Sequence, residues 1–120
     1  MSPTARSLQW LRKQGFVPAV VERFNSFSKQ RHDLFNAFDL VALHPHQHGL
    51  LGIQVTSKSN ASSRRNKLLQ NPLVALWLSS SNPVHLHYWG KKQGKWVLTR
   101  EVIYLHHVDN TLRAEAMIDE

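Results

Sequence analysis

Hydrophobic positions recur along the chain with two different periods, and these periods predict the order of the elements. Residues 3–14 have apolar positions at helical spacing, with Ser2 as an N-cap and Gly15 as a stop. Runs typical of strands follow over residues 16–24, 37–43 and 50–56, with a polar, basic connection over 25–36. Asn60 can cap a second helix that runs to about Gln70.

The second half of the chain predicts further strands. Residues 73–78 are continuously apolar, as in a buried central strand. Residues 84–89 alternate, and a turn at "GKKQGK" leads to a strand over 96–105. The predicted fold is α/β, a single mixed β-sheet flanked by helices. We expect residues 1–108 to form one domain and residues 109–120 a polar C-terminal tail with a short helix.

Composition narrows the class of protein. The 120 residues, 42% of them hydrophobic, can form one domain with a core of its own. The absence of cysteine excludes disulfides, zinc-thiolate sites and thiol nucleophiles. The start of the chain lacks the apolar core of a secretory signal, and no segment is long and apolar enough to span a bilayer. We therefore expect a soluble, cytoplasmic protein with no membrane partner.

The formal net charge of +7 predicts a polyanionic partner, and nucleic acid is the commonest one. The basic residues concentrate on the connection before Asp39 and on the second predicted helix: Lys29, Arg31, His32, Arg64, Arg65 and Lys67. They could grip phosphates on either side of a scissile bond. Two alternatives stay open, a solvated surface that favours solubility and a face that meets an acidic protein.

Asp39 interrupts an apolar strand. Alternation puts it on one face with Val41 and Leu43, while Phe38, Leu40 and Ala42 occupy the other face. A buried carboxylate is costly unless it is paired, hydrogen-bonded or bound to a metal. The alternative is an aspartate at the strand end that caps the preceding turn.

Gln54, Thr56 and Lys58 lie two residues apart, so they share one face of the following strand. In an ordinary hairpin register this row stands beside Asp39. The carboxylate and amide oxygens could hold Mg²⁺, and Lys58 with Thr56 could orient water or phosphate. The alternative is a solvated strand face.

The segments "LRKQGF", "DLVAL" and "GIQVTSK" resemble the core of the PD-(D/E)XK nuclease superfamily. The layout is similar to that of small Holliday-junction resolvase-like proteins from phages and mobile elements, over roughly residues 5–80. The resemblance implies a restriction-endonuclease-like α-β-β-β-α-β core. It also implies a Mg²⁺- or Mn²⁺-dependent endonuclease that hydrolyses phosphodiesters of branched or duplex DNA. A homodimer is expected for such an enzyme, because one domain of this size presents one site and symmetric cutting of two strands needs two. Asp39 takes the place of the acid on the second strand, and Gln54-Val55-Thr56 that of the acid-x-lysine motif.

The sequence departs from this family pattern in three ways. Gln54 is neutral where the family commonly has an acid, and Thr56 replaces the lysine, for which Lys58 could substitute. The first predicted helix has no acid, so Glu22 is the candidate for the missing carboxylate and third metal ligand. Glu22 is otherwise a surface residue paired with a neighbour such as Arg23. A catalytically degenerate nucleic-acid-binding module on the same fold is therefore the alternative function, and a basic protein-interaction subunit is a further one.

The histidines offer a different metal hypothesis. His44, His46 and His48 alternate along a predicted turn, as do His85 and His87 along a strand, and imidazoles at such spacings can bind Zn²⁺ or Ni²⁺. No cysteine or acid completes a closed four-ligand set. We therefore favour the hard-cation site around Asp39.

Overall fold

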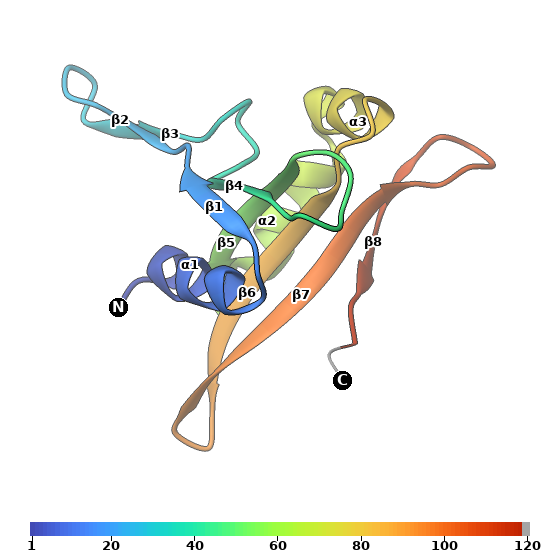
Figure 1. Cartoon of the computed structure of the whole chain (residues 1–120). Helices are drawn as coiled ribbons and strands as arrows, with labels where there is room; N and C mark the ends of the chain where they lie inside the picture. The colour runs from blue at the N-terminus through green and yellow to red at the C-terminus, as the bar shows by residue number, and fades with distance from the viewer. Residues whose placement is uncertain (119–120) are drawn as a thin grey trace.

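A mixed six-stranded sheet with helices on both faces forms the body of the protein (Figure 1). The structure is a computed structural model and describes residues 1–118. Along the chain the elements are α1 (Pro3–Lys13), β1 (Val17–Val20), β2 (Arg23–Asn25), β3 (Gln30–His32), β4 (Leu40–Leu43), β5 (Leu51–Ser57), the 3₁₀ turn η1 (Lys58–Asn60), α2 (Ala61–Leu69), α3 (Pro72–Ser79), β6 (Val84–Lys92), β7 (Lys95–Leu105) and β8 (Leu112–Ala116). Among the described helices, none has the length and apolar character needed to cross a membrane.

The strand order is β1-β4-β5-β6-β7-β8. β1, β4 and β5 pair antiparallel, with Leu40 opposite Ile53, and β6, β7 and β8 also pair antiparallel. A parallel pair, β5 with β6, joins these two groups. The crossover between them runs through α2 and α3, as a parallel connection requires. The predicted α/β class, with a mixed sheet and flanking helices, is confirmed, but the sheet is not single, because β2 and β3 form a second, two-stranded sheet.

Helix α1 covers one face of the sheet, and its predicted boundaries are close to the observed ones. The Ser2 hydroxyl oxygen accepts a hydrogen bond from the backbone N–H of Ala5 at 3.1 Å, and Gly15 stops the helix with a φ of +90°. Leu11 is fully buried and packs with Leu40 and Ile53 of the sheet. This apolar contact fixes the helix over β4 and β5.

A buried polar contact also holds α1 on the sheet. The indole N–H of Trp89 donates to the Ser7 hydroxyl oxygen at 2.9 Å, and the Ser7 hydroxyl is also hydrogen-bonded to Nδ1 of His87 at 3.0 Å. Burial lowers the pKa of His87 to about 3, with smaller contributions from His85 and Arg100. His87 is therefore a neutral imidazole that is hydrogen-bonded to α1 through Ser7.

Helices α2 and α3 cover the opposite face. Leu68 of α2 and Val74 of α3 pack with Leu86 in a fully buried cluster that also contains Phe38. The Phe38 ring lies so close to β5 that a Cβ at Gly52 would approach it to 2.8 Å. Glycine at position 52 therefore gives the aromatic ring its space in the core.

The predicted strand over residues 73–78 is wrong, because this segment forms helix α3. The Asn71 side chain caps the helix by accepting from the backbone N–H of Leu73 at 2.9 Å, and Pro72 takes the first helical position. "NP" thus ends α2 and begins α3. A short apolar run alone does not separate a strand from a helix, and the exposed Leu73 and Leu76 show that the run is not buried throughout.

The short helix predicted after Val108 is also wrong. Residues Leu112–Ala116 form β8 and pair with β7 in a register that puts Ala114 opposite Ile103. The turn that reverses the chain is closed by Asp109, whose carboxylate accepts from the backbone N–H of Thr111 at 3.0 Å. Of the tail expected over 109–120, residues 119–120 lie outside the described part.

The single strand predicted over residues 16–24 is wrong: the structure has the short strand β1 there, followed by a hairpin that also takes up part of the predicted connection. β1 ends at Val20, and residues 23–32 fold into a separate hairpin, β2–β3, that projects away from the sheet (Figure 1). Asn25 organises its turn by accepting from the backbone N–H groups of Phe27 and Ser28. The period-two pattern of residues 16–24 therefore spans two strands of different sheets.

Candidate functional site

Asp39 lies one residue before β4, and it is 5% exposed. Its backbone N–H donates to the carbonyl of Ile53 at 2.9 Å, so the ladder with β5 extends to this residue. Its Oδ2 accepts from the backbone N–H of Val55 at 2.7 Å and from Nε2 of Gln54 at 2.6 Å. The predicted convergence of Asp39 and Gln54 on one face of the sheet is confirmed.

A tight turn brings a second acid, Asp33, to Asp39. Leu34 and Phe38 form an antiparallel bridge across this turn, and Phe35 and Asn36 adopt left-handed φ values of 55° and 56°. The same register places Asp33 opposite Asp39.

The prediction that Phe38 shares a face with Leu40 and Ala42 is wrong, because the turn ends the strand pattern before Leu40. Phe38 packs with the α2 and α3 core, whereas Leu40 and Ala42 pack under α1. Alternation begins only at Leu40, where β4 begins, so Phe38 does not share a face with these two residues.

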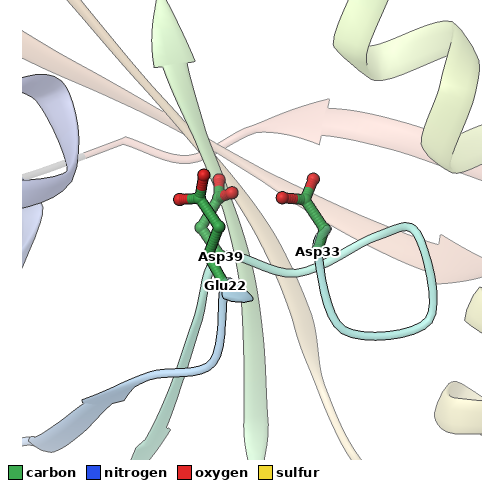
Figure 2. Close-up of side chains that lie close together, drawn as sticks. All are labelled: Glu22, Asp33 and Asp39. Carbon is green, nitrogen blue, oxygen red and sulfur yellow. The ribbon is translucent and has the colours of Figure 1, made fainter. Parts of the chain in front are cut away.

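Glu22 supplies a third carboxylate. It follows β1, and its backbone N–H donates to the Asp39 carbonyl at 3.3 Å. Carboxylate oxygens of Glu22, Asp33 and Asp39 lie within 4.8 Å of one another. Figure 2 shows all three side chains turned toward the same side. We call these three residues the acid cluster.

The acid cluster is electrostatically strained. Burial raises the pKa of Asp39 to about 7; the hydrogen bond from Val55 opposes this shift, and the nearby carboxyls of Asp33 and Glu22 add to it. Like charges at this spacing disfavour the ionised form of each other. A divalent cation among the three carboxylates would reverse this effect, because it favours all three charged forms.

Gln54 adds an oxygen that lacks a partner. The side chain is 1% exposed, and its Nε2 is committed to Asp39. Its Oε1 is buried and has no hydrogen-bond partner among the described residues. Leaving a buried acceptor unpaired costs about 1–3 kcal/mol, so such atoms commonly meet an ion or an ordered water. Carboxylate and amide oxygens together form the donor set that Mg²⁺ prefers.

A cleft of about 910 Å³ contains the acid cluster and Gln54. The N-terminus of α1, the β2–β3 hairpin, the end of β5 and helix α2 contribute its walls. The cationic side chains that line it are Arg31, Arg64 and Lys67, together with His32. Negative charge at the floor and positive charge on the walls would suit a phosphate held beside a cation.

The other residues of the predicted catalytic row divide between two environments. Thr56 is buried and lines the cleft. Lys58 follows the end of β5 and begins η1, so the period of two no longer determines its direction. Its methylene groups cover Gly90, where an added Cβ would lie 2.9 Å from the Lys58 Cδ. Lys58 is not among the residues that line the cleft, and neither is Lys29 of the β2–β3 turn.

Arg65 points away from the cleft that its neighbours line. Its Nε donates to Oε1 of Glu101 at 2.7 Å, and its Nη2 donates to Oε2 at 2.5 Å. The Tyr88 hydroxyl donates to the same Oε2 at 2.7 Å. Arg64 and Lys67 are three residues apart and share the helix face toward the cleft. We therefore assign Arg65 to the fold and keep Arg64 and Lys67 as candidate phosphate contacts.

Asp33 is the site residue that the sequence analysis missed. The signal was available in "DLFNAFD", where Asp33 and Asp39 are placed symmetrically about Asn36. A tight turn centred on an asparagine brings such flanking residues opposite one another. Among the described residues 1–118, the side chains close enough to share a metal ion are those of Glu22, Asp33 and Asp39. No histidine belongs to this group.

No family model, curated protein or solved structure matches this chain. Its function is therefore inferred from the geometry of the acid cluster and the cleft.

Proposed function

We propose that this chain is a divalent-cation-dependent endodeoxyribonuclease that hydrolyses phosphodiesters of branched or duplex DNA. One observation carries the proposal. Three carboxylates with oxygens within 4.8 Å of one another line a cleft with cationic walls, next to Gln54, whose Oε1 has no hydrogen-bond partner among the described residues. Without a cation the three acids repel one another. A cation bound beside a phosphate would offset the negative charge of the acid cluster and that of the substrate.

The residues of the site fit Mg²⁺ or Mn²⁺. Asp39, Asp33 and Glu22 would supply carboxylate oxygens, and Gln54 its amide oxygen. A bound cation of this kind lowers the pKa of a coordinated water and offsets charge on the phosphate. Arg64 and Lys67 would hold the flanking phosphates, and Thr56 would offer a hydroxyl at the end of β5.

The order of the helices and strands supports a more specific fold within the α/β class. A helix, three antiparallel strands, a helical crossover and a parallel strand occur in that sequence, over α1 to β6. This is the order expected of the α-β-β-β-α-β core that the sequence motifs resemble. We propose a restriction-endonuclease-like fold on this ground, and a homodimer because symmetric cutting of two strands needs two sites.

Metal-dependent cleavage tests the proposal. Supercoiled plasmid and a four-way junction would be incubated with the protein across titrations of Mg²⁺ and Mn²⁺. We expect nicked or cut products that EDTA abolishes. A protein that binds both substrates but cuts neither at any cation concentration would contradict the enzymatic function.

The second candidate is a nucleic-acid-binding module without catalysis. The position of Lys58 favours it, because that side chain packs on Gly90 and not among the residues that line the cleft. Salt-sensitive binding without cleavage would support this function. Absence of binding to any nucleic acid would favour the basic protein-interaction subunit.

Replacing Arg64 with alanine should weaken DNA binding similarly on different sequences. Removing one arginine–phosphate interaction should reduce the slope of log K against log salt by about 0.9 for duplex DNA. Fluorescence anisotropy over a salt series measures this slope. Arg12→Ala, which removes an exposed arginine of α1 outside the cleft lining, is the matched control. An unchanged slope for Arg64→Ala would remove the cleft from the DNA interface.

Gln54→Glu should change cation binding in a specific direction. A fourth carboxylate would lower stability in EDTA, since it faces the acid cluster, and would strengthen binding of a hard cation. The rise in Tm on adding Mg²⁺ should therefore be larger than for the unchanged protein. Gln93→Glu, at the exposed tip between β6 and β7, is the control for added charge alone. Equal cation-dependent shifts in all three proteins would show that Gln54 does not face a bound ion.

A further inference from the structure

The β2–β3 hairpin is exposed over its whole length. All six residues of its two strands are exposed, and the hairpin projects from the sheet as a separate two-stranded ribbon (Figure 1). Its own ladder, with Phe24 opposite Arg31, holds the strands together. Two-stranded ribbons are only marginally stable by themselves in water, so this one would gain from a partner.

The tip of the hairpin carries an aromatic ring in solvent. Phe27 is 97% exposed, and Phe24 on the adjacent strand is 60% exposed. Two exposed aromatics within four residues, on a segment that the core does not need, indicate a contact surface rather than packing. An aromatic face of this kind can stack on an unpaired base.

The charge of the hairpin identifies the class of partner. Residues 23–32 contain Arg23, Lys29 and Arg31 and no acid. Arg31 and His32 also line the cleft of the acid cluster, so basic side chains extend from the cleft wall onto the hairpin; Arg31 stays 74% exposed although its Nη1 lies 3.7 Å from Oε1 of Glu22. A polyanionic strand that places one phosphate in the cleft would run onto this surface.

We propose that the β2–β3 hairpin binds unpaired nucleotides next to the scissile phosphate, with Phe27 stacking on an exposed base. The inference rests on the proposed function and narrows its substrate to DNA in which a duplex meets single strands. In an intact duplex each base is already stacked on its neighbours and offers no face to Phe27. At a branch or fork the unpaired bases offer that face, and Arg31 with Lys29 can hold their phosphates.

Binding measured without cleavage tests the inference. A forked DNA with unpaired arms and a fully paired duplex of equal length would be titrated in EDTA, with fluorescence anisotropy as the readout. We expect Phe27→Ala to bind the fork about tenfold more weakly and to bind the duplex within about twofold of the unchanged protein. Phe27→Trp should restore the affinity for the fork. Val108→Ala is the matched control, because it removes an exposed apolar side chain from the turn between β7 and β8.

Stacking itself has a separate signal. A 2-aminopurine placed in the unpaired arm beside the fork should be quenched by the unchanged protein and by Phe27→Trp, and not by Phe27→Ala. Loss of affinity on fork and duplex alike, or on neither, would overturn the inference. So would a Phe27→Ala protein that loses self-association in sedimentation while it keeps its affinity for the fork. Cleavage by a protein that binds fork and duplex equally would overturn only this inference, whereas binding to neither DNA would overturn the proposed function as well.

Discussion

Replacing Asp39 with asparagine is expected to lower the rate of DNA cleavage by about 10³-fold or more, because a cation-bound carboxylate contributes several kcal/mol to catalysis. The substitution removes one charge from the acid cluster and keeps the shape of the side chain. Its Oδ1 can still accept from the Val55 N–H, which holds Asp39 in place. Single-turnover cleavage of a plasmid at saturating Mg²⁺ measures the effect.

Two controls separate loss of chemistry from loss of fold. DNA affinity should stay within about twofold, since phosphate contacts come from the basic walls of the cleft. The Tm in EDTA should not fall, because a neutral side chain relieves the repulsion from Asp33 and Glu22. Asp109→Asn, in the turn before β8, is the matched substitution away from the cleft and should cut normally. Equal cleavage by Asp39→Asn and the unchanged protein would place catalysis elsewhere.

Glu101→Ala is expected to destabilise the fold by about 2–3 kcal/mol. Loss of one partner of a fully buried ion pair costs about 3–5 kcal/mol, and the Arg65 side chain, at 30% exposure, is partly solvated once Glu101 is removed. The Tyr88 hydroxyl also loses its acceptor. Urea unfolding measures the change, and Glu115→Ala on exposed β8 should stay within about 0.5 kcal/mol of the unchanged protein.

The contribution of Glu101 should also depend on pH in a defined direction. The hydrogen bond from Arg65 holds the pKa of the Glu101 carboxyl below its ordinary value of 4.5. As pH falls below 4.5 the unfolded chain takes up this proton first, so the stabilisation present at neutral pH is lost on acidification. The difference in unfolding free energy between the unchanged protein and Glu101→Gln should therefore shrink between about pH 7 and about pH 3. A difference that is constant with pH would show that the ion pair contributes little.

Period-two patterning predicted the hairpin of β4 and β5 and the meeting of Asp39 with Gln54, because alternate apolar residues of both strands pack together under α1 and fix the register. It failed at Lys58, where the strand ends and a 3₁₀ turn begins. Such a boundary depends on packing against Gly90, a residue far along the chain. Strand ends are therefore where local sequence no longer determines which way a side chain faces.

The remaining errors arise where tertiary contacts decide. Charge alone marked both Arg64 and Arg65 as phosphate contacts, and only the fold reveals that Glu101, on a distant strand, binds Arg65. The apolar pattern of residues 73–78 is compatible with a strand and with a helix, and the N-cap at Asn71 favours the helix that forms. Local patterns thus identified most element types and part of the site, while partners distant in sequence determined the rest.

The parallel pairing of β5 with β6 has a consequence for the order of folding. The groups β1-β4-β5 and β6-β7-β8 can each form from antiparallel neighbours, whereas β5 and β6 meet only after the crossover of residues 58–83 has closed. Closure of a long connection costs entropy before its contacts form. The acid cluster belongs to the first group, and Arg64 and Lys67 belong to the crossover. Arg31, whose Nη1 lies 3.7 Å from Oε1 of Glu22, precedes the crossover and can accompany the acids from the start, whereas Arg64 and Lys67 reach the cleft only when the crossover closes.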